Sequence, residues 1–438
     1  MTRPVRAGLM RAVPLRAEAA NPWDVGPWRD ILFLVTFLLL WLGLDPFTNL
    51  SSGDVLDQIG GGLLNQVSTL LLTAVLAAFV AQSGTWPVLR AAASPLLCAT
   101  LAWFALSAAF SLNAELAARR LILATLTIFQ ACAFLTIPRD LRDFARLMTI
   151  GALIVVVVCF LGVAFLPQLA IHQANDLREP ELAGDWRGAF AHKNGAGAEM
   201  VMFIFFGLFA ARLWNPIAGW TLVGLAGIFL YFSHSKSPLG LLPVVLVLPL
   251  VAARLPYLWA RFGLLLPLPL ILSLMTIGSV TIPGVQEALE MVMSDASFTG
   301  RDVIWRFAID NATARPFVGH GFQAFWGTND LVQNWTPSES WGMRASDAHN
   351  GFLNLSVMTG YVGMALATTW IVVQPIVDQI RTRVADPDLT LLFLRIWFFG
   401  LCLSSLESVL FSGGNTLWFM MAVTIVGFRL QASKRLIR

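Results

Sequence analysis

The sequence is poor in charge, which excludes an ordinary soluble domain. Only 13% of the 438 residues are charged, while 57% are hydrophobic. A soluble domain carries about a quarter charged residues, so the composition predicts a membrane protein. The net charge of +3 is too small to indicate a nucleic-acid partner. Tryptophan and phenylalanine are abundant and tyrosine is scarce, a balance that suits lipid contact and the membrane interface.

Cysteine is also scarce, and no pair has the spacing of a metal or redox site. Each of the four lies inside an apolar run, with no Cys-x-x-Cys pair. We therefore interpret them as small core hydrophobes and predict no disulfide and no metal site. They are Cys98, Cys132, Cys159 and Cys402.

Nucleotide-binding motifs are missing as well. The sequence has no Walker-type phosphate loop and no dinucleotide fingerprint. It also has no polar stretch long enough for a soluble domain on the side that we assign below to the cytoplasm. We therefore expect no nucleotide, no other cofactor and no ATP-driven reaction.

What the sequence does contain is a series of long hydrophobic runs. A membrane-spanning helix needs about 20 mostly apolar residues, and roughly twelve runs approach that length. The sequence thus predicts an all-α integral membrane protein, with a polytopic domain over 30–430 between basic cytoplasmic tails at 1–29 and 431–438. The runs are 30–46, 62–82, 94–113, 118–137, 145–166, 195–212, 216–233, 237–254, 258–281, 349–376, 389–406 and 412–430.

The distribution of Lys and Arg predicts the orientation of these helices. In a twelve-helix arrangement nearly all basic loops fall on the side of the two termini, and this side is the cytoplasm by the positive-inside rule. Arg119 and Arg120 are the exception. The opposite face then carries two long loops, about 168–194 and about 282–348, the second between helices nine and ten. All five histidines fall on that outer side, so any chemistry is expected there.

His349 stands where the second loop enters a helix, in the order His349-Asn350, nine residues, Gly360, two residues, Gly363. The positive end of the helix dipole disfavours an imidazolium, so we expect a neutral imidazole that can accept a proton. Asn350 can orient the ring or bind a hydroxyl group. Gly360 and Gly363 would let a neighbouring helix approach closely. The alternative is a His-Asn pair that only caps the helix.

Two arginines of the outer loops are candidate phosphate ligands. Arg187 and Arg301 each have a neighbouring glycine and nearby aromatic residues. Guanidinium groups bind phosphate with two hydrogen bonds, so the pair could hold a diphosphate. The alternative is a solvated arginine, or one paired with Asp185 or Asp302. Further candidate substrate-binding residues follow Arg187 at the start of a helix: His192, Lys193 and Asn194.

Other polar residues on the outer side are weaker candidates. His320 lies in a Pro- and Gly-rich turn after a helical run over 302–314, and is a second histidine for substrate binding. Lys236 follows a helix break and could bind an anion, or simply extend to the interface. For Glu407 we weigh a place in the lining of a cavity against a buried partner for a basic residue.

The motif around His349 resembles that of the O-antigen ligase and polysaccharide polymerase superfamily of bacterial membrane glycosyltransferases. Gly300-Arg301 with Ile304-Trp305, followed by Pro316, Gly319 and Gly321, resembles the opening of that superfamily's large periplasmic loop. Arg187 to Asn194 resembles its earlier periplasmic segment. Within the superfamily, Phe190 to Gly195 and Ser235 to Pro238 look most like exopolysaccharide polymerases of the succinoglycan type.

The resemblance implies a metal-independent glycosyl transfer at the periplasmic face of the bacterial inner membrane. The donor would be a glycan on undecaprenyl diphosphate, with Arg187 and Arg301 stabilising the leaving diphosphate and His349 taking the acceptor's proton or orienting the acceptor. Membrane lipid, a chain-length regulator and a flippase are candidate partners. The acceptor would be a second lipid-linked repeat unit or, in the ligase alternative, lipid A core or a protein. A glycolipid transporter and a structural assembly partner are the further alternatives.

Overall fold

The described part of the chain consists of helices and the loops between them. The computed structural model describes residues 26–50, 63–176, 179–292, 298, 300–327, 345–382 and 385–433. Within these residues the only β-type contact is an isolated bridge between Ile171 and Trp186. The helices are α1 (Trp28–Leu42), α3 (Leu63–Ser83), α4 (Trp86–Ala92), α5 (Pro95–Ala109), α6 (Ala114–Phe134), α7 (Leu141–Phe165), α8 (Pro167–Ala170), η2 (Pro180–Leu182), α9 (Lys193–Leu213), α10 (Pro216–Phe232), α11 (Lys236–Arg254), α12 (Leu258–Leu265), α13 (Pro267–Thr281), α14 (Pro283–Val292), α15 (Arg301–Ala314), α18 (Gly351–Thr368), η4 (Thr369–Val373), α19 (Gln374–Arg381), α20 (Pro387–Ser404) and α21 (Thr416–Ala432).

Each of the twelve hydrophobic runs coincides with a helix or with consecutive helices. Among the described residues, eight helical segments are long and apolar enough to cross a membrane, or nine if the bent pair α4–α5 counts as one span. The apolar helices α10 and α21 are shorter. The prediction of an all-α integral membrane protein is confirmed, while the number of twelve crossings stays a prediction. The predicted tails lie largely outside the described residues.

Polar residues at the ends of loops determine where several helices begin. Each side chain accepts a hydrogen bond from a backbone N–H of the first helical turn, which would otherwise lack a partner. Within lipid this is important, because no water is available to the freed N–H groups. Such residues are Ser94, Asn113, Asp140, Asn215, Asp386 and Asn415.

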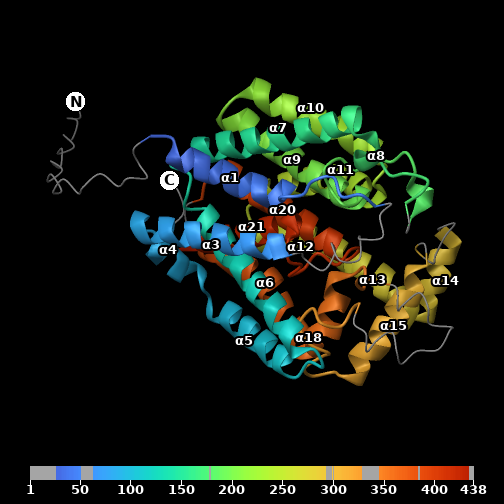
Figure 1. Ribbon diagram of the computed structural model, residues 1–438. Helices are drawn as coiled ribbons and strands as arrows, with labels where there is room; N and C mark the ends of the chain where they lie inside the picture. Colours follow the sequence, from blue (N-terminus) through green and yellow to red (C-terminus); the bar gives the residue numbers. More distant parts are fainter. Residues whose placement is uncertain are drawn as a thin grey trace, which may run out of the picture.

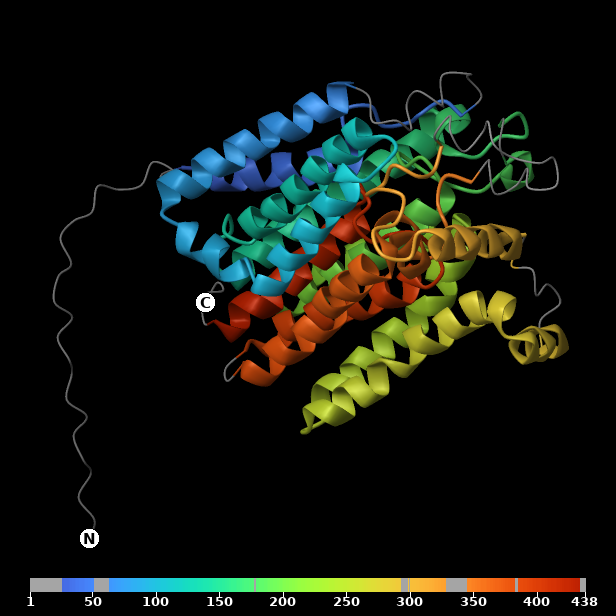
Figure 2. The same ribbon diagram turned by 90° about the horizontal axis from the view of Figure 1, so that it is seen from below.

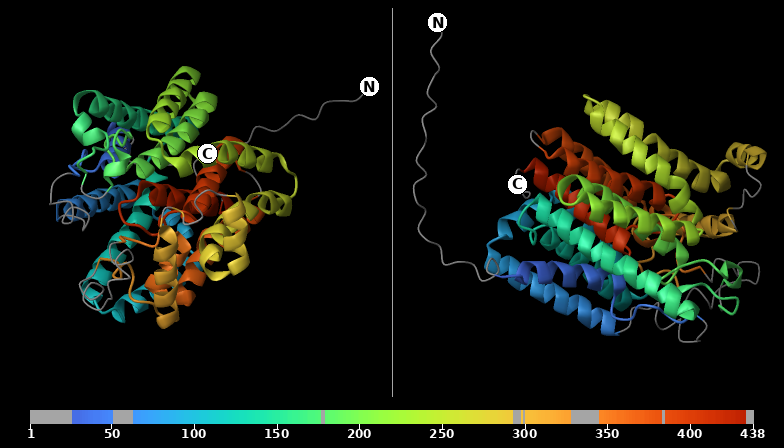
Figure 3. Two further views of the ribbon diagram at one scale, coloured as in Figure 1. Left: turned by 90° about the vertical axis from the view of Figure 1, so that its right-hand side faces the viewer. Right: turned by 90° about the horizontal axis from the view of Figure 1, so that it is seen from above.

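The most buried helices lie at the centre of the bundle, and they lead to the candidate site. The apolar windows of α9 and α20 are each 78% buried, against 22% for α3 and 28% for α12–α13. Figures 2 and 3 show α3 and α12–α13 on opposite sides of the bundle, with α20 and α21 between them. The outer-loop helices α8, α14 and α15 gather at one end (Figure 1). α9 begins at this end and α20 ends there. The residues at these two helix ends are therefore anchored by the buried core of the bundle.

α18 is broken at Gly360, which has φ +69°. The loop 315–321 docks at the break: Tyr361 donates its N–H to the Pro316 carbonyl (2.7 Å), and His320 donates its N–H to the Val357 carbonyl (3.0 Å). A Cβ on Gly360 would lie 2.0 Å from the Phe317 carbonyl oxygen. The expectation that Gly360 admits a neighbouring helix is therefore wrong, because what approaches here is this loop.

Gly363 does face a helix. A Cβ there would lie 2.9 Å from the Trp103 ring of α5 and closer still to Thr359. Trp103 also donates its indole N–H to the Thr359 carbonyl (3.0 Å), one of the groups next to the helix break. Two faces of α18 are thus held by different partners, the loop on one side and α5 on the other.

The helix α14 forms the start of the second outer loop, with Leu289 buried and Met291 82% exposed. The expectation for the cysteines has a mixed outcome. All four cysteines are free, and three of them are buried as expected. Cys98 is exposed on α5, so its assignment to the core is wrong.

Candidate functional site

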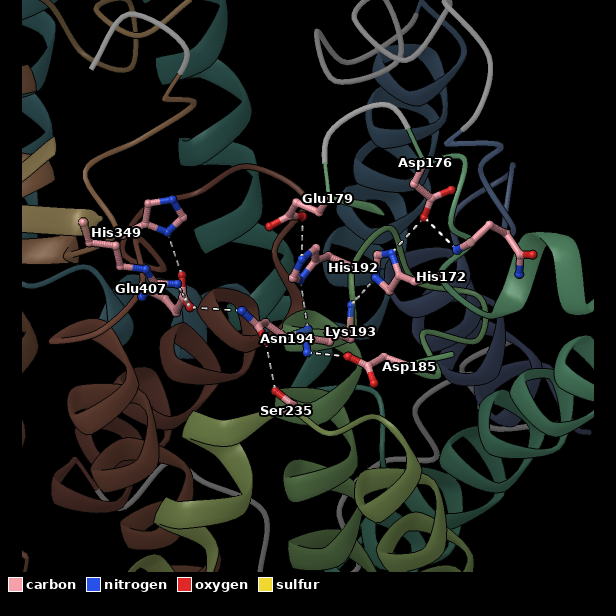
Figure 4. A network of polar contacts seen from close by, with 12 residues as sticks. His172, Asp176, Glu179, Asp185, His192, Lys193, Asn194, Ser235, His349 and Glu407 are labelled. Atoms are coloured by element: carbon pink, nitrogen blue, oxygen red, sulfur yellow. Dashed lines mark hydrogen bonds and ion pairs between the residues drawn. The ribbon is translucent and has the colours of Figure 1, made fainter. Parts of the chain in front are cut away.

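Several helix ends meet around one carboxylate at the loop end of the bundle. Glu407, which follows α20, accepts hydrogen bonds from Arg301 at the start of α15 (3.0 Å) and from Asn194 in the first turn of α9 (3.4 Å). Its second oxygen lies 3.1 Å from Nδ1 of His349, just before α18. Asn194 in turn accepts from Ser235, just before α11 (3.3 Å). Figure 4 shows the contacts of Glu407 with His349 and Asn194 and of Asn194 with Ser235, and we call Arg301, Asn194, His349 and Ser235 together with Glu407 the Glu407 cluster.

His349 is held in a strained backbone conformation. Its φ is +45°, a region that residues with a side chain rarely adopt. The Asp347 carboxylate stabilises the turn by accepting the His349 N–H at 2.8 Å. Strained residues persist only where their surroundings fix them, and they gather at functional sites. The turn directs the imidazole toward Glu407 (Figure 4).

The contact with Glu407 determines which nitrogen of His349 is available. A carboxylate can only accept, so Nδ1 carries the proton and donates it to Oε2 of Glu407. Within the described residues, Nε2 of His349 has no hydrogen-bond partner, and the side chain is 29% exposed. The ring is therefore arranged as a base whose free nitrogen can accept a proton from outside.

The charges around the ring raise the pKa of His349 above its ordinary value. Burial alone would lower that pKa, but the hydrogen bond to Glu407 and the charges of Asp347 and Glu407 outweigh burial, with Arg301 opposing them. The expected preference for a neutral imidazole through the helix dipole is thus wrong in direction. For Glu407, burial by itself raises the pKa. The hydrogen bonds and charges of His349 and Arg301 outweigh burial and hold this pKa below the usual range, so the carboxylate is ionised.

Arg301 supplies the guanidinium of the Glu407 cluster. Besides its contact with Glu407, it donates to the Leu406 carbonyl at 2.8 Å, and its side chain is 24% exposed. The preceding Gly300 has φ +79°, so the chain turns sharply into α15 and presents Arg301 at the helix start. The sequence left open an ion pair between Arg301 and Asp302. Among the described residues Arg301 pairs with Glu407 instead. The exposed part of the guanidinium remains available to an anion.

The start of α9 carries a second histidine–carboxylate pair. His192 caps the helix, because its Nδ1 accepts the Asn194 N–H at 3.0 Å. Its Nε2 therefore carries the proton and donates it to Glu179 at 2.9 Å. The pKa of Glu179 is lowered, mainly by this hydrogen bond, and the charge of His349 contributes as well. Glu179 thus lies close enough to His349 to link this pair to the Glu407 cluster electrostatically.

Next to His192, at the start of α9, Lys193 forms an ion pair with Asp185. Its ammonium lies 2.5 Å from Asp185, whose other oxygen is 2.6 Å from Nδ1 of His234. Burial raises the pKa of Asp185, but the hydrogen bonds of Lys193 and His234 bring it below the usual value. Lys193 is only 12% exposed. Its charge is thus balanced, whereas Lys236 at the start of α11 is exposed and has no partner among the described residues.

Behind this layer, His172 is buried and fully engaged. Its Nδ1 donates to Asp176 at 3.1 Å, and its Nε2 accepts the Lys193 N–H at 3.3 Å. Burial lowers the pKa of His172, more than Asp176 raises it. The ring lies 5.2 Å from that of His192. His172 therefore supports the start of α9 and has no nitrogen left for a substrate.

Asn350 is completely buried, and every atom of its amide is used. Its oxygen accepts the N–H groups of Phe352 and Leu353, and its nitrogen donates to Thr276 and to the Ser405 carbonyl. Asn350 therefore caps α18, as the alternative reading of the His-Asn pair predicted. The same bonds tie the start of α18 to the end of α20, so Asn350 holds His349 and Glu407 in register. Its contact with a substrate stays a prediction.

Arg187 and His320 are also bound to the protein itself. Arg187 is 1% exposed and donates to the carbonyls of Phe190 (3.1 Å) and Thr48 (2.6 Å). The alternative ion pair of Arg187 with Asp185 does not occur among the described residues, and burial lowers the pKa of Arg187. His320 donates from Nε2 to the Asn311 carbonyl at 3.0 Å, and burial lowers its pKa. Both side chains stabilise loops, and none of their contacts in the described part of the chain is with the Glu407 cluster.

The residue that sequence reasoning underrated is Glu407. It is the only acidic residue between Leu389 and the last residue, Arg438, and it follows a long apolar run. An ionisable group at that place is costly unless it is paired, so the signal was present. What the sequence could not show is that both Arg301 and His349 would reach it across more than 50 residues of chain.

These features define a polytopic helical membrane protein with a histidine, a carboxylate and an arginine gathered at one end of the bundle. Residues 220–368 match the family model described as O-antigen ligase. The exopolysaccharide production protein ExoQ of Rhizobium meliloti (strain 1021) is 26% identical over 223 residues, which are 47% of this chain and 50% of that protein. The chain thus matches half the length of this relative. Both findings support the resemblance to the O-antigen ligase and polymerase superfamily, and the family match includes Arg301 and His349.

Proposed function

We propose that this protein is a glycosyltransferase that polymerises undecaprenyl-diphosphate-linked repeat units into an exopolysaccharide at the periplasmic face of the inner membrane. The observation that supports it most is the pair of groups on Glu407: an imidazole with a free Nε2 beside a partly exposed guanidinium. Transfer from a lipid diphosphate needs a group of each kind, one to take a proton and one to stabilise the leaving charge.

The proposed step is a single displacement. The acceptor hydroxyl attacks the anomeric carbon of the donor, the bond between that carbon and the phosphate oxygen breaks, and the diphosphate leaves on its lipid. Nε2 of His349 takes the hydroxyl proton, and Glu407 stabilises the imidazolium that forms. Arg301 faces the diphosphate as its charge grows, and the exposed Lys236 is the second cation proposed for it.

The other predicted residues have indirect roles in this proposal. His192, Lys193 and Asn194 shape the start of α9, and Asn194 also donates to Glu407. Arg187, Asn350 and His320 hold the loops that carry the reacting groups. Among the described residues no group of three or more His, Cys, Asp or Glu could hold a metal ion. Independence from metals and cofactors stays a prediction, as do contacts with a chain-length regulator or a flippase.

Ligation to lipid A core or a protein is the second candidate, and it would use the same groups. The description of the matching family favours ligation, whereas the name of the Rhizobium relative favours exopolysaccharide production. A glycolipid transporter is less well supported. Transporters bind their substrate near the membrane midplane, whereas the polar groups here gather at one end of the bundle.

A reconstitution experiment separates these candidates. Purified protein in liposomes receives lipid-diphosphate-linked repeat units without another acceptor, and His349→Gln and Arg301→Gln serve as comparisons. A ladder of glycans made by the wild type, and reduced in both variants, is the expected result. Product only after addition of lipid A core or a protein acceptor would make the enzyme a ligase. Passage of intact lipid-linked sugar across the bilayer without product would replace the enzyme by a transporter.

A further inference from the structure

An arginine that forms no ion pair with the described residues lies in the apolar part of α20. Arg395 is the ninth residue of this helix, and its Nε is buried with no hydrogen-bond partner. No ion pair of Arg395 occurs among the described residues. A charged group inside a membrane segment is costly and nearly always has a partner. The described part of the protein thus supplies no partner for this group, and a ligand is one source of it.

The surroundings of Arg395 form a small groove between α9 and α20. Asp388, Leu391, Leu392 and Arg395 are spaced as i, i+3, i+4 and i+7, so they share one face of α20. The opposite wall comes from α9, with Arg212 at its end. The groove is shallow and open, and its lining residues are Phe205, Leu208, Phe209, Arg212, Asp388, Leu391, Leu392 and Arg395.

The charges in this groove do not balance. Arg212 donates to Asp388 at 2.8 Å, and this pair uses the only carboxylate of the lining. Within the described residues no carboxylate forms an ion pair with Arg395, because Asp388 is already paired with Arg212. Two arginines against one aspartate leave a net charge of +1. An anion with an apolar body would complement both the charge and the phenylalanine and leucine walls.

The groove lies toward the end of the bundle opposite the Glu407 cluster. α9 starts at that cluster and ends at Leu213, while α20 starts at Pro387 and leads to Glu407. Arg395 is seven residues from Asp388, or about 10 Å along the helix axis. A guanidinium at this depth can extend toward a headgroup while its stem stays among apolar side chains.

We propose that this groove binds an anionic phospholipid of the leaflet opposite the Glu407 cluster, with its phosphate on Arg395 and Arg212. The lipid headgroup supplies the negative charge that the protein lacks here, and the acyl chains lie along the apolar walls. Guanidinium groups suit this role because they hold phosphate with paired hydrogen bonds and are weakly hydrated. The groove shares no residue with the proposed glycosyl transfer.

The test uses the purified full-length protein, stripped of lipid in a neutral detergent and titrated with phosphatidylglycerol, phosphatidylcholine or sodium phosphate. Native mass spectrometry counts bound lipid and thermal unfolding measures stabilisation. The wild type should bind phosphatidylglycerol in preference to phosphatidylcholine. Arg395→Gln should weaken phosphatidylglycerol binding about tenfold, close to 1.4 kcal/mol. Arg254→Gln, which removes an exposed charge at the same end of the bundle, should leave binding unchanged.

Two further measurements test whether loss of binding could come from a damaged fold. Arg395→Lys keeps the charge and should keep most of the preference. Without lipid, Arg395→Gln should unfold at the wild-type temperature or above, because it removes an unpaired charge from an apolar site. The proposal is overturned if Arg395→Gln binds phosphatidylglycerol like the wild type, or if phosphatidylcholine binds equally well. Equal stabilisation by phosphate alone would make the ligand a free anion instead of a lipid.

Discussion

Arg301 and His349 contact the same carboxylate from two sides. Nη2 of Arg301 lies 3.0 Å from one oxygen of Glu407, and Nδ1 of His349 lies 3.1 Å from the other. The two neighbours act on the imidazole in opposite directions, since Glu407 raises the pKa of His349 and Arg301 lowers it. Glu407 therefore sets both the tautomer and the basicity of the proposed base.

Replacing Glu407 by glutamine should move the pH dependence of glycan formation. A base must be deprotonated to work, so activity rises as the pH passes upward through the pKa of His349. The Glu407 carboxylate favours the imidazolium, and its removal lowers that pKa. We expect the acid limb of the pH–rate profile to shift to lower pH. Turnover on its plateau should fall about tenfold or more, since an oriented base contributes roughly 10²–10⁴-fold.

The matched control for this variant is Glu287→Gln, which removes an exposed glutamate from α14. It should change neither the plateau nor the limb. A Glu407→Gln enzyme that is slower but has its limb unmoved would show that His349 positions the acceptor without taking its proton.

Arg301→Gln should move the same limb in the opposite direction. Loss of this cation removes a charge that opposes protonation of His349, so the pKa rises further and the limb shifts to higher pH. Loss of a donor to the leaving diphosphate should also lower turnover about 10²–10³-fold. Both effects are read from initial rates of glycan formation against pH.

Arg306→Gln is the control for Arg301, because Arg306 lies on the same helix and its only hydrogen bond to the described residues is with the Val280 carbonyl, at 3.5 Å. Its rates should match the wild type. If Arg301→Gln lowered the affinity for donor while leaving turnover intact, stabilisation of the leaving group would have to be abandoned as its role.

Most helices could be predicted because the physics of the membrane is local. A run of about 20 apolar residues is sufficient to call for a spanning helix, and the run 195–212 corresponds to α9. The break in α18 was harder to foresee. Gly360 was visible, but its positive φ depends on a loop 40 residues upstream that supplies hydrogen bonds to the freed backbone.

The site was predictable in its residue types but not in its pairings. His349 and Arg301 were identified from motif and chemistry, and the structure brings both to Glu407. Arg187 was predicted in an outer loop as a phosphate ligand or, alternatively, a solvated or paired arginine, yet it is buried and donates to the Thr48 carbonyl. The sequence indicates that the Arg187 guanidinium lies on the outer side. It cannot indicate the acceptors, because they are backbone carbonyls, which every residue has.

Arg187→Gln should therefore destabilise the protein more than it affects the chemistry. The guanidinium donates to two carbonyls from a site that is 1% exposed, and hydrogen bonds of charged groups contribute about 1.5–3 kcal/mol each. Thermal unfolding in detergent should show a lower midpoint than for the wild type or His349→Gln. A variant with an unchanged unfolding midpoint but no activity would instead support the predicted role of Arg187 in binding the diphosphate.

Gly360→Ala tests whether the break in α18 is needed for the site. An alanine there would need φ +69° and would place Cβ 2.0 Å from the Phe317 carbonyl, so either the helix straightens or the loop 315–321 leaves. We expect a clear loss of thermal stability, because Ala is strained where φ is positive. Gly224→Ala on α10, where nothing lies within 4 Å, should be neutral or slightly stabilising. If both variants unfold alike, the docked loop contributes nothing to the fold. If only Gly360→Ala loses stability and it also loses glycan formation, the loop that precedes His349 depends on the break for its position.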